Sequence, residues 1–441
     1  MFISNTAKDR EEMLKAIGVS SFDELVKNIP QALRNPKLGL PAALDEIELS
    51  AHIKELGSKN AKVVNFAGAG AYDRFAPSVV KALASRGEFV TAYTPYQAEA
   101  SQGMLQAIYE YQSSMCALMD MEVSNASMYD AASALAEAVN AALRITGRKK
   151  VLLPRALHPH YAATVKTYFD AAGVSFVEIP CPQGVIDQKA LDSMLDETVA
   201  AVVLPNPNFF GCIEDLDTIS AKAKAKKAVL IAVVQDPVSL GLLRSPGSFG
   251  ADIAVGEGQG LGLGLSFGGP YLGIFTCKKE HVRHMPGRIC GITADADGKR
   301  AFVLTLQARE QHIRREKAAS NICSNEALCG LYATMYLAAL GPQGLKEVAE
   351  LNLDRAHYAA EKIASVKGYS LKFKGPFFNE FVIECPRDAR VVRDAALKSG
   401  MLAGVPLADF FPEMKNSLLV CATEMRTEAE IDALCGALGR I

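Results

Sequence analysis

Residues 198–236 read TVAAVVLPNPNFFGCIEDLDTISAKAKAKKAVLIAVVQD and contain two apolar runs on either side of an amphipathic segment. The runs at 198–204 and 229–234 predict strands, because they are short, continuous and rich in valine, isoleucine and leucine. Residues 216–225 have the apolar spacing of a helix. Strands that are apolar on both faces are typical of a parallel sheet covered by helices on both sides. This unit therefore predicts an α/β fold.

The same alternation continues toward the N-terminal side of this unit. Strands are expected at 150–153 and 174–179, and helices at 134–145, 161–172 and 189–195. Together these elements predict a mostly parallel sheet. In open sheets of this kind, ligands bind at the carboxyl ends of the strands. That rule singles out Pro154-Arg155, Pro205 to Asn208, and Gln235-Asp236-Pro237.

The two ends of the chain have a different character. Residues 1–60 predict a helical arm of short amphipathic helices, which seldom bury enough surface alone and are expected to pack on a neighbouring domain or subunit. After about residue 330, helices mix with strands at 370–374, 380–384 and 417–421. The predicted organisation is an arm (1–60), a large α/β domain (61–330) and a small C-terminal α+β domain (331–441).

Composition excludes several classes of protein. Apolar residues make up 49% of the chain and charged residues 22%, which is typical of a globular protein and not of a disordered one. The net charge of -2 gives no electrostatic reason to expect nucleic acid as a partner. The longest apolar run near the middle, 228–234, is far shorter than the roughly 18 residues of a membrane span.

The ten cysteines contain no C-x-x-C pair, which favours free thiols in a reducing compartment over a disulfide framework or a zinc site. Residues 1–10 have no apolar core after a basic start, and Asp9, Glu11 and Glu12 are unlike a mitochondrial transit peptide. The expected location is the cytoplasm, with no metal site.

Three sets of residues are candidates for chemistry on spacing alone. His281 and His284 have the i, i+3 spacing of two metal ligands, but nothing nearby completes a ligand set. His158-Pro159-His160 follows a predicted strand and is either a proline turn or a group that faces a site. In the stretch 309–317 (REQHIRREK), Arg309 and Arg314 either hold a carboxylate or belong to a solvated helix face.

A fourth set joins Asp236 to the glycine-rich run 256–270, GEGQGLGLGLSFGGP. A strand that leads to an Asp, followed about 23 residues later by a glycine-rich turn, is the layout of pyridoxal phosphate enzymes on this architecture. There the Asp pairs with the pyridinium nitrogen, and a lysine on the later turn forms the Schiff base. This run has no lysine, and an amide cannot condense with an aldehyde. A phosphate cradle is the alternative interpretation of the glycines.

The loop 91–103, TAYTPYQAEASQG, carries several hydroxyl groups and one carboxylate. Tyr93, Tyr96 and Glu99 either form the rim of a polar pocket or belong to a solvated loop before a helix.

Long contiguous stretches of the chain resemble the glycine cleavage system P-protein family, glycine dehydrogenase (decarboxylating), in its split two-subunit form and on the alpha-subunit side. The matching stretches are 66–72 with Pro77, 91–102, 127–130 leading to 136–138, 256–273, Gly287-Arg288 and 305–323. Where the family usually has Tyr-Asp-Gly-Ala-Thr, this chain has Tyr129-Asp130-Ala131-Ala132-Ser133.

The resemblance implies a fold-type I pyridoxal phosphate transferase architecture with a seven-stranded type of sheet. It implies a subunit of the enzyme of class EC 1.4.4.2, which decarboxylates glycine and passes the aminomethyl group to the lipoyl group of the H-protein. Alignment on the final Gly-Gly-Pro puts Gln259 at the Schiff-base lysine, so pyridoxal phosphate is expected on the beta subunit and Asp236 is a vestigial pyridinium partner. The expected assembly is an α2β2 heterotetramer, and the isolated chain is expected to be inactive.

No residue of this chain is assigned a catalytic role. The residues expected to border the partner's active site are Tyr93, Tyr96, Glu99, Tyr129, Arg309 and His312. Two alternatives stay open: a self-sufficient pyridoxal phosphate lyase or decarboxylase that uses another lysine, such as Lys278, and a non-catalytic scaffold or regulator.

Overall fold

The computed structural model describes residues 4–34 and 36–441, which form two compact units, Met1–Ala61 and Lys62–Ile441. The described part of the first unit is helical and contains α1 (Ala7–Ile17), α2 (Phe22–Leu25), η1 (Gln31–Leu33) and α3 (Glu46–Ser58). Capping boxes begin α1 at Thr6 and α3 at Asp45. None of the described residues of this unit is buried, so its helices form without a core of their own.

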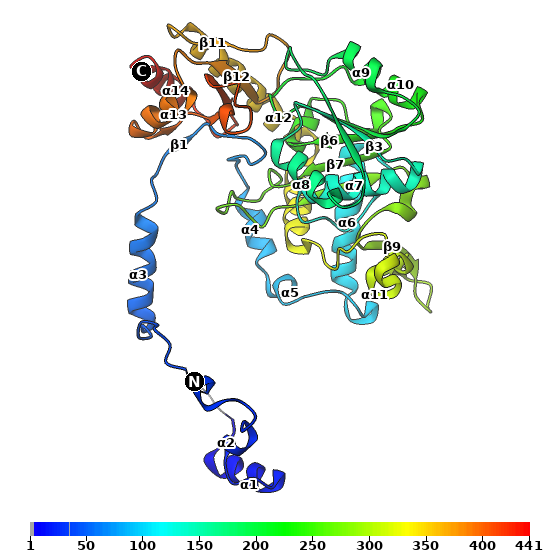
Figure 1. Cartoon of the computed structure of the whole chain (residues 1–441), viewed down its shortest axis with the longest axis vertical. Helices are drawn as coiled ribbons and strands as arrows, with labels where there is room; N and C mark the ends of the chain where they lie inside the picture. Colours follow the sequence, from blue (N-terminus) through cyan, green and yellow to red (C-terminus); the bar gives the residue numbers. More distant parts are fainter. Residues whose placement is uncertain (1–3, 35) are drawn as a thin grey trace. The chain divides into compact units, whose positions relative to one another are not determined.

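A seven-stranded sheet organises the second unit, in the order β2-β8-β7-β6-β5-β3-β4 (Figure 1). Strands β7, β6, β5, β3 and β4 are parallel, whereas β8 is antiparallel to both of its neighbours, β7 and the edge strand β2. The strands are β2 (Val123–Ser124), β3 (Lys150–Pro154), β4 (Ser175–Ile179), β5 (Val199–Pro205), β6 (Val229–Val234), β7 (Ile253–Glu257) and β8 (Gly273–Cys277). The mostly parallel α/β sheet expected from the sequence is confirmed.

Alternate residues of the central strands face two separate cores. Val203 and Ile231 pack with α7 (Ala131–Thr146) and α8 (Pro159–Phe169) on one face. Val202 and Leu230 face the other core. That core is covered by α6 (Gln102–Met119), α9 (Gln188–Met194), α10 (Leu216–Ala225) and the first half of α12 (Ala327–Ser365). Burial on both faces explains why β5 and β6 are apolar throughout.

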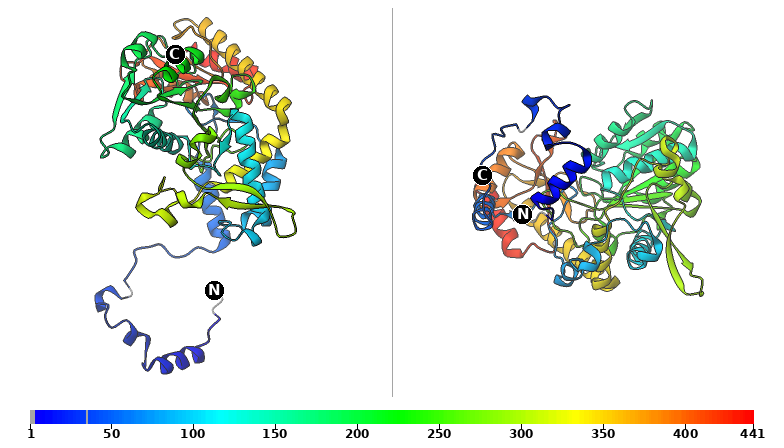
Figure 2. Two further views of the ribbon diagram at one scale, coloured as in Figure 1. Left: turned by 90° about the vertical axis from the view of Figure 1, so that its right-hand side faces the viewer. Right: turned by 90° about the horizontal axis from the view of Figure 1, so that it is seen from below.

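The glycine-rich run begins inside a strand that the sequence did not predict. Gly256 and Glu257 end β7, which lies between β6 and β8. A second unpredicted element is the antiparallel hairpin of β9 (Ile289–Ala294) and β10 (Arg300–Thr305), which projects from the body as a ribbon (Figure 2). Glycine and alanine, which are depleted in strands, interrupt the apolar pattern of β7 and β9.

The C-terminal lobe has its own antiparallel sheet, ordered β11-β12-β15-β14, and its own core. Its elements are β11 (Ser370–Leu371), β12 (Glu380–Glu384), α13 (Ala389–Lys398), β13 (Met401–Leu402), β14 (Val405–Pro406), β15 (Ser417–Cys421) and α14 (Glu428–Leu438). The helix α12 leads into the lobe and is interrupted at Gly341, whose φ of 62° and ψ of -177° break the helical path just before Pro342.

The lobe also takes up the start of the second unit. Strand β1 (Val64–Asn65) pairs in parallel with β13, and Phe66 is fully buried in the lobe's core. Two short helices, α4 (Ser78–Ala84) and α5 (Gly87–Val90), follow. The domain limits at 60 and 330 stay predictions, and α12 runs across the second of them.

All ten cysteines are free thiols, as their spacing predicts. No helix within 4–34 and 36–441 is both long and apolar enough to cross a membrane.

Candidate functional site

Asp236 lies two residues beyond β6, at the carboxyl edge of the parallel strands, and is 2% exposed. Its Oδ1 accepts a hydrogen bond from the Val238 backbone N–H at 3.2 Å. Its Oδ2 accepts one from Asn379 Nδ2 at 2.8 Å and pairs with the guanidinium of Arg74. The carboxylate that was expected to be a vestigial pyridinium partner is therefore occupied by side chains of this chain.

Arg74 is held in place by two carboxylates and an amide. Its side chain is 1% exposed, and NH1 donates to Glu424 Oε2 at 2.8 Å and to Asn352 Oδ1 at 2.9 Å. Asn352 Nδ2 in turn donates to Glu424 Oε2 at 2.8 Å. Each of the two buried carboxylates therefore has the same buried guanidinium as its ion-pair partner. This network joins the loop after β1, the end of β6, α12 and the small lobe.

Gln259 lies in the first turn after β7 and has no exposed surface. Its side-chain amide bonds the main chain of Tyr72 twice, since Oε1 accepts from Tyr72 N at 2.8 Å and Nε2 donates to Tyr72 O at 3.0 Å. Nε2 also donates to Leu263 O at 3.0 Å. The side-chain amide therefore pairs with the main chain of Tyr72 as a peptide group of a neighbouring strand would, and it holds the segment 72–74 against the turn.

A buried carboxyl supports the same segment from the small lobe. Glu380 accepts hydrogen bonds from Ala69 N at 2.6 Å and from the Tyr72 hydroxyl at 2.8 Å. Gln235 Nε2 donates to the Tyr72 oxygen at 2.8 Å. Burial raises the pKa of Glu380 to about 7, so this carboxyl titrates near neutral pH.

His158 also faces this loop. It is the N-cap of α8, with Pro159 in the first turn, and its Nδ1 accepts the His160 backbone N–H at 3.1 Å. The proton therefore sits on Nε2, which donates to Ala69 O at 2.8 Å. Burial lowers the pKa of His158 to about 4, and its ring stacks on Tyr161 with centroids 4.3 Å apart. The stretch His158-Pro159-His160 therefore begins a helix and does not form a separate proline turn, and the neutral ring of His158 faces the loop at Ala69.

The residues present do not fit pyridoxal phosphate. The only group at Gln259 is an amide, which cannot form a Schiff base, and Asp236 is paired with Arg74. The space is also filled, because a Cβ added at Gly260 would lie 3.0 Å from Arg74 Nε. The contact between Arg74 and Asp236 was not predicted, because the two residues are 162 positions apart in the sequence.

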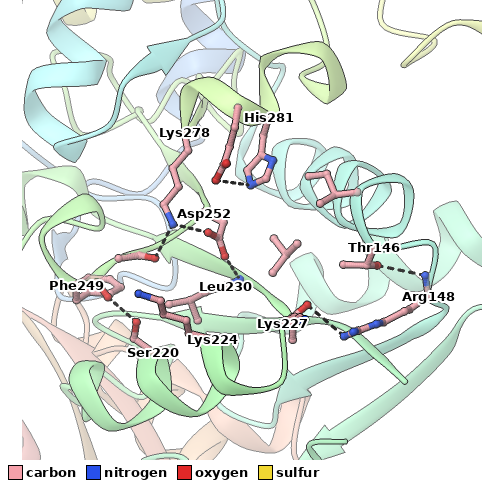
Figure 3. A pocket seen from close by; sticks show the side chains of 15 residues that line it. Thr146, Arg148, Ser220, Lys224, Lys227, Leu230, Phe249, Asp252, Lys278 and His281 are labelled. Atoms are coloured by element: carbon pink, nitrogen blue, oxygen red, sulfur yellow. Dashed lines mark hydrogen bonds and ion pairs between the residues drawn. The ribbon is translucent and has the colours of Figure 1, made fainter. Parts of the chain in front are cut away.

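Lys278 is at the opposite edge of the sheet. It follows β8, next to the start of β7, and its ammonium pairs with Asp252 Oδ1 at 2.5 Å (Figure 3). It borders a cavity of about 630 Å³ together with Arg148, Lys224 and Lys227. The six residues of β6 separate this edge from Asp236, a strand length of about 20 Å. This geometry does not allow Lys278 to share a cofactor with Asp236.

The loop residues expected to border a partner's site lie on the surface. Tyr93 is 82% exposed, Tyr96 is 71% exposed and Glu99 is exposed. Tyr129, 41% exposed, precedes the capping box of Asp130 and Ser133 that begins α7. The serine at the end of that family motif is therefore part of a helix cap.

Arg309 and His312 differ in their surroundings. The Arg309 guanidinium donates to the backbone carbonyl oxygens of Gly287, at 2.9 Å, and Met285, and thus holds the turn before β9. His312 is exposed and borders a cavity of about 520 Å³ that Tyr96 also lines. The structure therefore brings Tyr96 and His312 to one cavity.

Two buried charged residues of this cavity were not predicted from the sequence. Arg288 and Glu310 line it and are 7% and 8% exposed, and the exposed Arg315 lines it as well. Both buried residues lie in stretches that match the family, and a charged residue within such a stretch was the signal that the sequence offered.

His281 and His284 lie in η5 (Lys279–His284), and no group of three metal-ligating side chains occurs in the part of the chain that the structure describes.

Comparison with known proteins finds relatives along nearly the whole chain. The family model of the glycine cleavage system P-protein matches residues 1–438. The chain is 51% identical over 444 residues to the probable glycine dehydrogenase (decarboxylating) subunit 1 of Desulfitobacterium hafniense, covering 100% of this chain and 99% of that one. It is 52% identical over 445 residues to the protein of the same description from Chlorobium limicola, covering 100% of both.

Solved structures give the same result. A crystal structure of glycine decarboxylase (P-protein) of the glycine cleavage system, in inhibitor-bound form, matches with a TM-score of 0.93 and 43% identity, covering 100% of this chain and 99% of that one. A sphingosine-1-phosphate lyase of Burkholderia pseudomallei matches with a TM-score of 0.67 and 14% identity, covering 93% and 94%, which shows a shared fold alone. On the strength of these full-length matches, the chain belongs to the glycine cleavage system P-protein family.

Proposed function

We propose that this chain is the alpha subunit of a two-subunit glycine decarboxylase and that the beta subunit carries the cofactor. The observation that carries the proposal is the closed site. Asp236 is neutralised by Arg74, and Gln259 stands where the family alignment puts the Schiff-base lysine. A chain with this arrangement and 51% identity to proteins described as subunit 1 is a partner of the catalytic subunit and not a second copy of it.

The assembled enzyme acts on glycine, releases carbon dioxide and passes the aminomethyl group to the lipoyl group of the H-protein, in the cytoplasm and as an α2β2 assembly. Pyridoxal phosphate bound to the beta subunit supplies the electron sink that stabilises the carbanion left by decarboxylation. The alpha chain covers one side of the partner's active site, where it excludes water and orients groups at the border of that site.

The exposed aromatic side chains are the part of this chain best suited to that role. Tyr93 and Tyr96 are large, exposed and adjacent in one loop, and Glu99 follows them. Exposed tyrosines of this kind are enriched at protein interfaces, where they bury a ring and keep a hydroxyl for a hydrogen bond. Tyr129 and His312 complete the set of surface groups, whereas Arg309 supports the turn behind them.

Reconstitution tests the proposal. The alpha chain is co-expressed with a lysine-bearing homologue of this fold, and glycine decarboxylation and borohydride trapping of pyridoxal phosphate are measured. A stable complex, activity that needs both chains and a label on the beta chain alone are expected. A labelled lysine in this chain would establish the self-sufficient alternative, and unchanged activity on adding this chain would establish the scaffold alternative.

Substitutions test the loop within that complex. Tyr96→Phe and Glu99→Ala should each lower turnover while the complex assembles normally. Tyr168→Phe, an exposed tyrosine of α8, is the matched control and should leave turnover unchanged. Equal turnover in all three variants would remove the loop from the active-site border.

A further inference from the structure

The cavity of about 520 Å³ beside Tyr96 contains a pair of buried, oppositely charged residues that do not satisfy each other. Arg288 directly precedes β9, and Glu310 lies in the segment that follows β10. Their side chains are 8% and 7% exposed, yet Arg288 Nε and Glu310 Oε2 are 4.0 Å apart. That separation is longer than a hydrogen bond.

Arg288 has unused hydrogen-bonding capacity. Within residues 4–34 and 36–441, its recorded contacts are the approach to Glu310 and the face of the Tyr96 ring, 5.8 Å from the guanidinium carbon. A guanidinium carries five N–H donors in a planar fork that matches a carboxylate. Its neighbour Arg309 is engaged by two backbone carbonyls. The other arginine that lines the cavity, Arg315, is exposed, so Arg288 is the buried arginine whose fork faces the cavity.

In the part of the chain that the structure describes, Glu310 lacks hydrogen-bond donors, just as Arg288 lacks acceptors. Its Oε1 is buried and has no hydrogen-bond partner among the described residues. Its Oε2 has only charged neighbours beyond hydrogen-bond distance, Arg288 Nε at 4.0 Å and His312 Nδ1 at 3.9 Å. A buried carboxylate without donors keeps the cost of its desolvation without a compensating hydrogen bond. The cavity therefore offers an unsatisfied acceptor next to an unsatisfied fork of donors.

We infer that this cavity binds a small zwitterion of the amino acid class, with its carboxylate on Arg288 and its ammonium group on Glu310. A simple anion would satisfy Arg288 but would lie beside the unpaired Glu310 oxygen. A simple cation would leave the guanidinium without a partner. A molecule with both charges a few bonds apart satisfies both residues at once, and the exposed ring of Tyr96 borders it on the third side.

The inference rests on this chain's geometry, and it rests on the proposed function only for the choice of glycine as the probe. Saturation-transfer NMR on the full-length chain measures binding of glycine, with acetate and methylamine as the two half-molecules. Glycine is expected to bind saturably, and each half-molecule at least about tenfold more weakly, because each keeps one of the two charge-assisted contacts.

Matched variants assign the contacts. Arg288→Met and Glu310→Gln should each weaken glycine binding by at least about tenfold. Arg283→Met and Glu316→Gln, at exposed positions nearby, should bind glycine like the unchanged chain. Thermal unfolding is recorded for every variant, and Arg288→Lys, which keeps the charge but loses the fork, replaces Arg288→Met if the latter does not fold.

Three results would overturn the inference: no saturable glycine binding, acetate bound as tightly as glycine, or binding that Arg288 and Glu310 substitutions leave intact. The second result would indicate a general anion site. Decarboxylation by the reconstituted enzyme is measured separately, so loss of the proposed function with retained glycine binding is distinguishable from the reverse.

Discussion

At the scale of single residues, Arg74 neutralises two acidic groups that lie far apart in sequence. Asp236 and Glu424 are both nearly inaccessible to water, and each pairs with one arm of the same guanidinium. A buried carboxylate that loses its partner keeps the desolvation penalty without the compensating attraction. Arg74 therefore contributes to the stability of the fold by preventing two buried carboxylates from lacking an ion-pair partner.

The first prediction concerns this arginine. Arg74→Ala should lower the free energy of unfolding by about 3–5 kcal/mol, because it leaves two buried carboxylates unpaired. Urea unfolding followed by circular dichroism measures the change. Arg86→Ala, which removes an exposed ion pair with Glu88, should leave the unfolding midpoint where it was. Equal effects of the two substitutions would contradict the prediction.

The second prediction concerns Gln259. Gln259→Lys supplies an amine but leaves Arg74 on Asp236 and the segment 72–74 in the cleft. The variant should therefore gain no borohydride-fixed cofactor when incubated with pyridoxal phosphate. Mass spectrometry of the 259-containing peptide after reduction gives the answer, with a lysine at the exposed position 361 (Glu361→Lys) as the control for nonspecific labelling. Selective labelling at 259 would show that the cleft opens.

At the scale of elements, Glu257 connects the end of β7 to the beginning of α7. Its Oε1 accepts from Gln259 N at 3.0 Å and Leu272 N at 3.1 Å, and its Oε2 accepts from Ala131 N at 3.1 Å. A carboxyl group thus satisfies a free N–H at the first residue of the helix, where anions are favoured. The strand, the turn and the helix share one side chain.

The third prediction follows from the titration of this group. Burial raises the pKa of Glu257 from its ordinary value near 4.5 to about 8. The folded chain therefore holds a proton that the unfolded chain releases, and stability falls as pH rises between these two values, by at most about 1.4 kcal/mol per pH unit for this group. Glu257→Gln should flatten that fall.

Urea unfolding at several pH values between about 5 and 8 tests the slope. Some pH dependence should remain, because burial also raises the pKa values of Glu380 and Glu214 to about 7. Glu361→Gln, at an exposed position of α12, is the control and should keep the full slope. A Glu257→Gln slope equal to that of the control would refute the assignment.

At the scale of the whole molecule, the first unit is an arm without a core. Its helices α1 and α3 leave large apolar side chains exposed, such as Ile17 at 59% and Ile47 at 81%. Isolated helices of 11 and 13 residues are marginal in water. Amphipathic helices of this kind are stabilised by packing against another surface, which is consistent with the proposed role as one subunit of an assembly.

The fourth prediction is that the arm becomes ordered by its partner. In the isolated chain, limited proteolysis should cleave within residues 4–61 before it cleaves 62–441, and co-assembly with the beta subunit should slow the arm's cleavage. Leu49→Ser and Ile53→Ser, which lie about one turn apart on one exposed face of α3, should abolish that protection, whereas Lys54→Ser should not. Protection already complete in the isolated chain would contradict the prediction.

The sequence predicted correctly those elements whose structure is encoded in adjacent residues, and it missed those that depend on contacts with distant residues. Strand β6 has its predicted bounds because a run of six buried apolar residues has no other stable solution. The interruption of α12 at Gly341-Pro342 is likewise encoded in adjacent residues, since proline disrupts a helix at the residues before it. Strand β7 was missed because its Gly256 and Glu257 do not favour a strand, and only pairing with β6 and β8 makes it one.

The amino-acid sequence alone determined the α/β class, the order of its elements, the absence of a lysine from the glycine-rich run and the family resemblance, because each of these is encoded in contiguous residues. The tertiary structure alone decided that Arg74 fills the cleft at Asp236, that Gln259 binds the main chain of Tyr72, and that Arg288 and Glu310 share a cavity. These contacts join residues from about 20 to 350 positions apart. Only folding brings such residues together, so no local pattern records them.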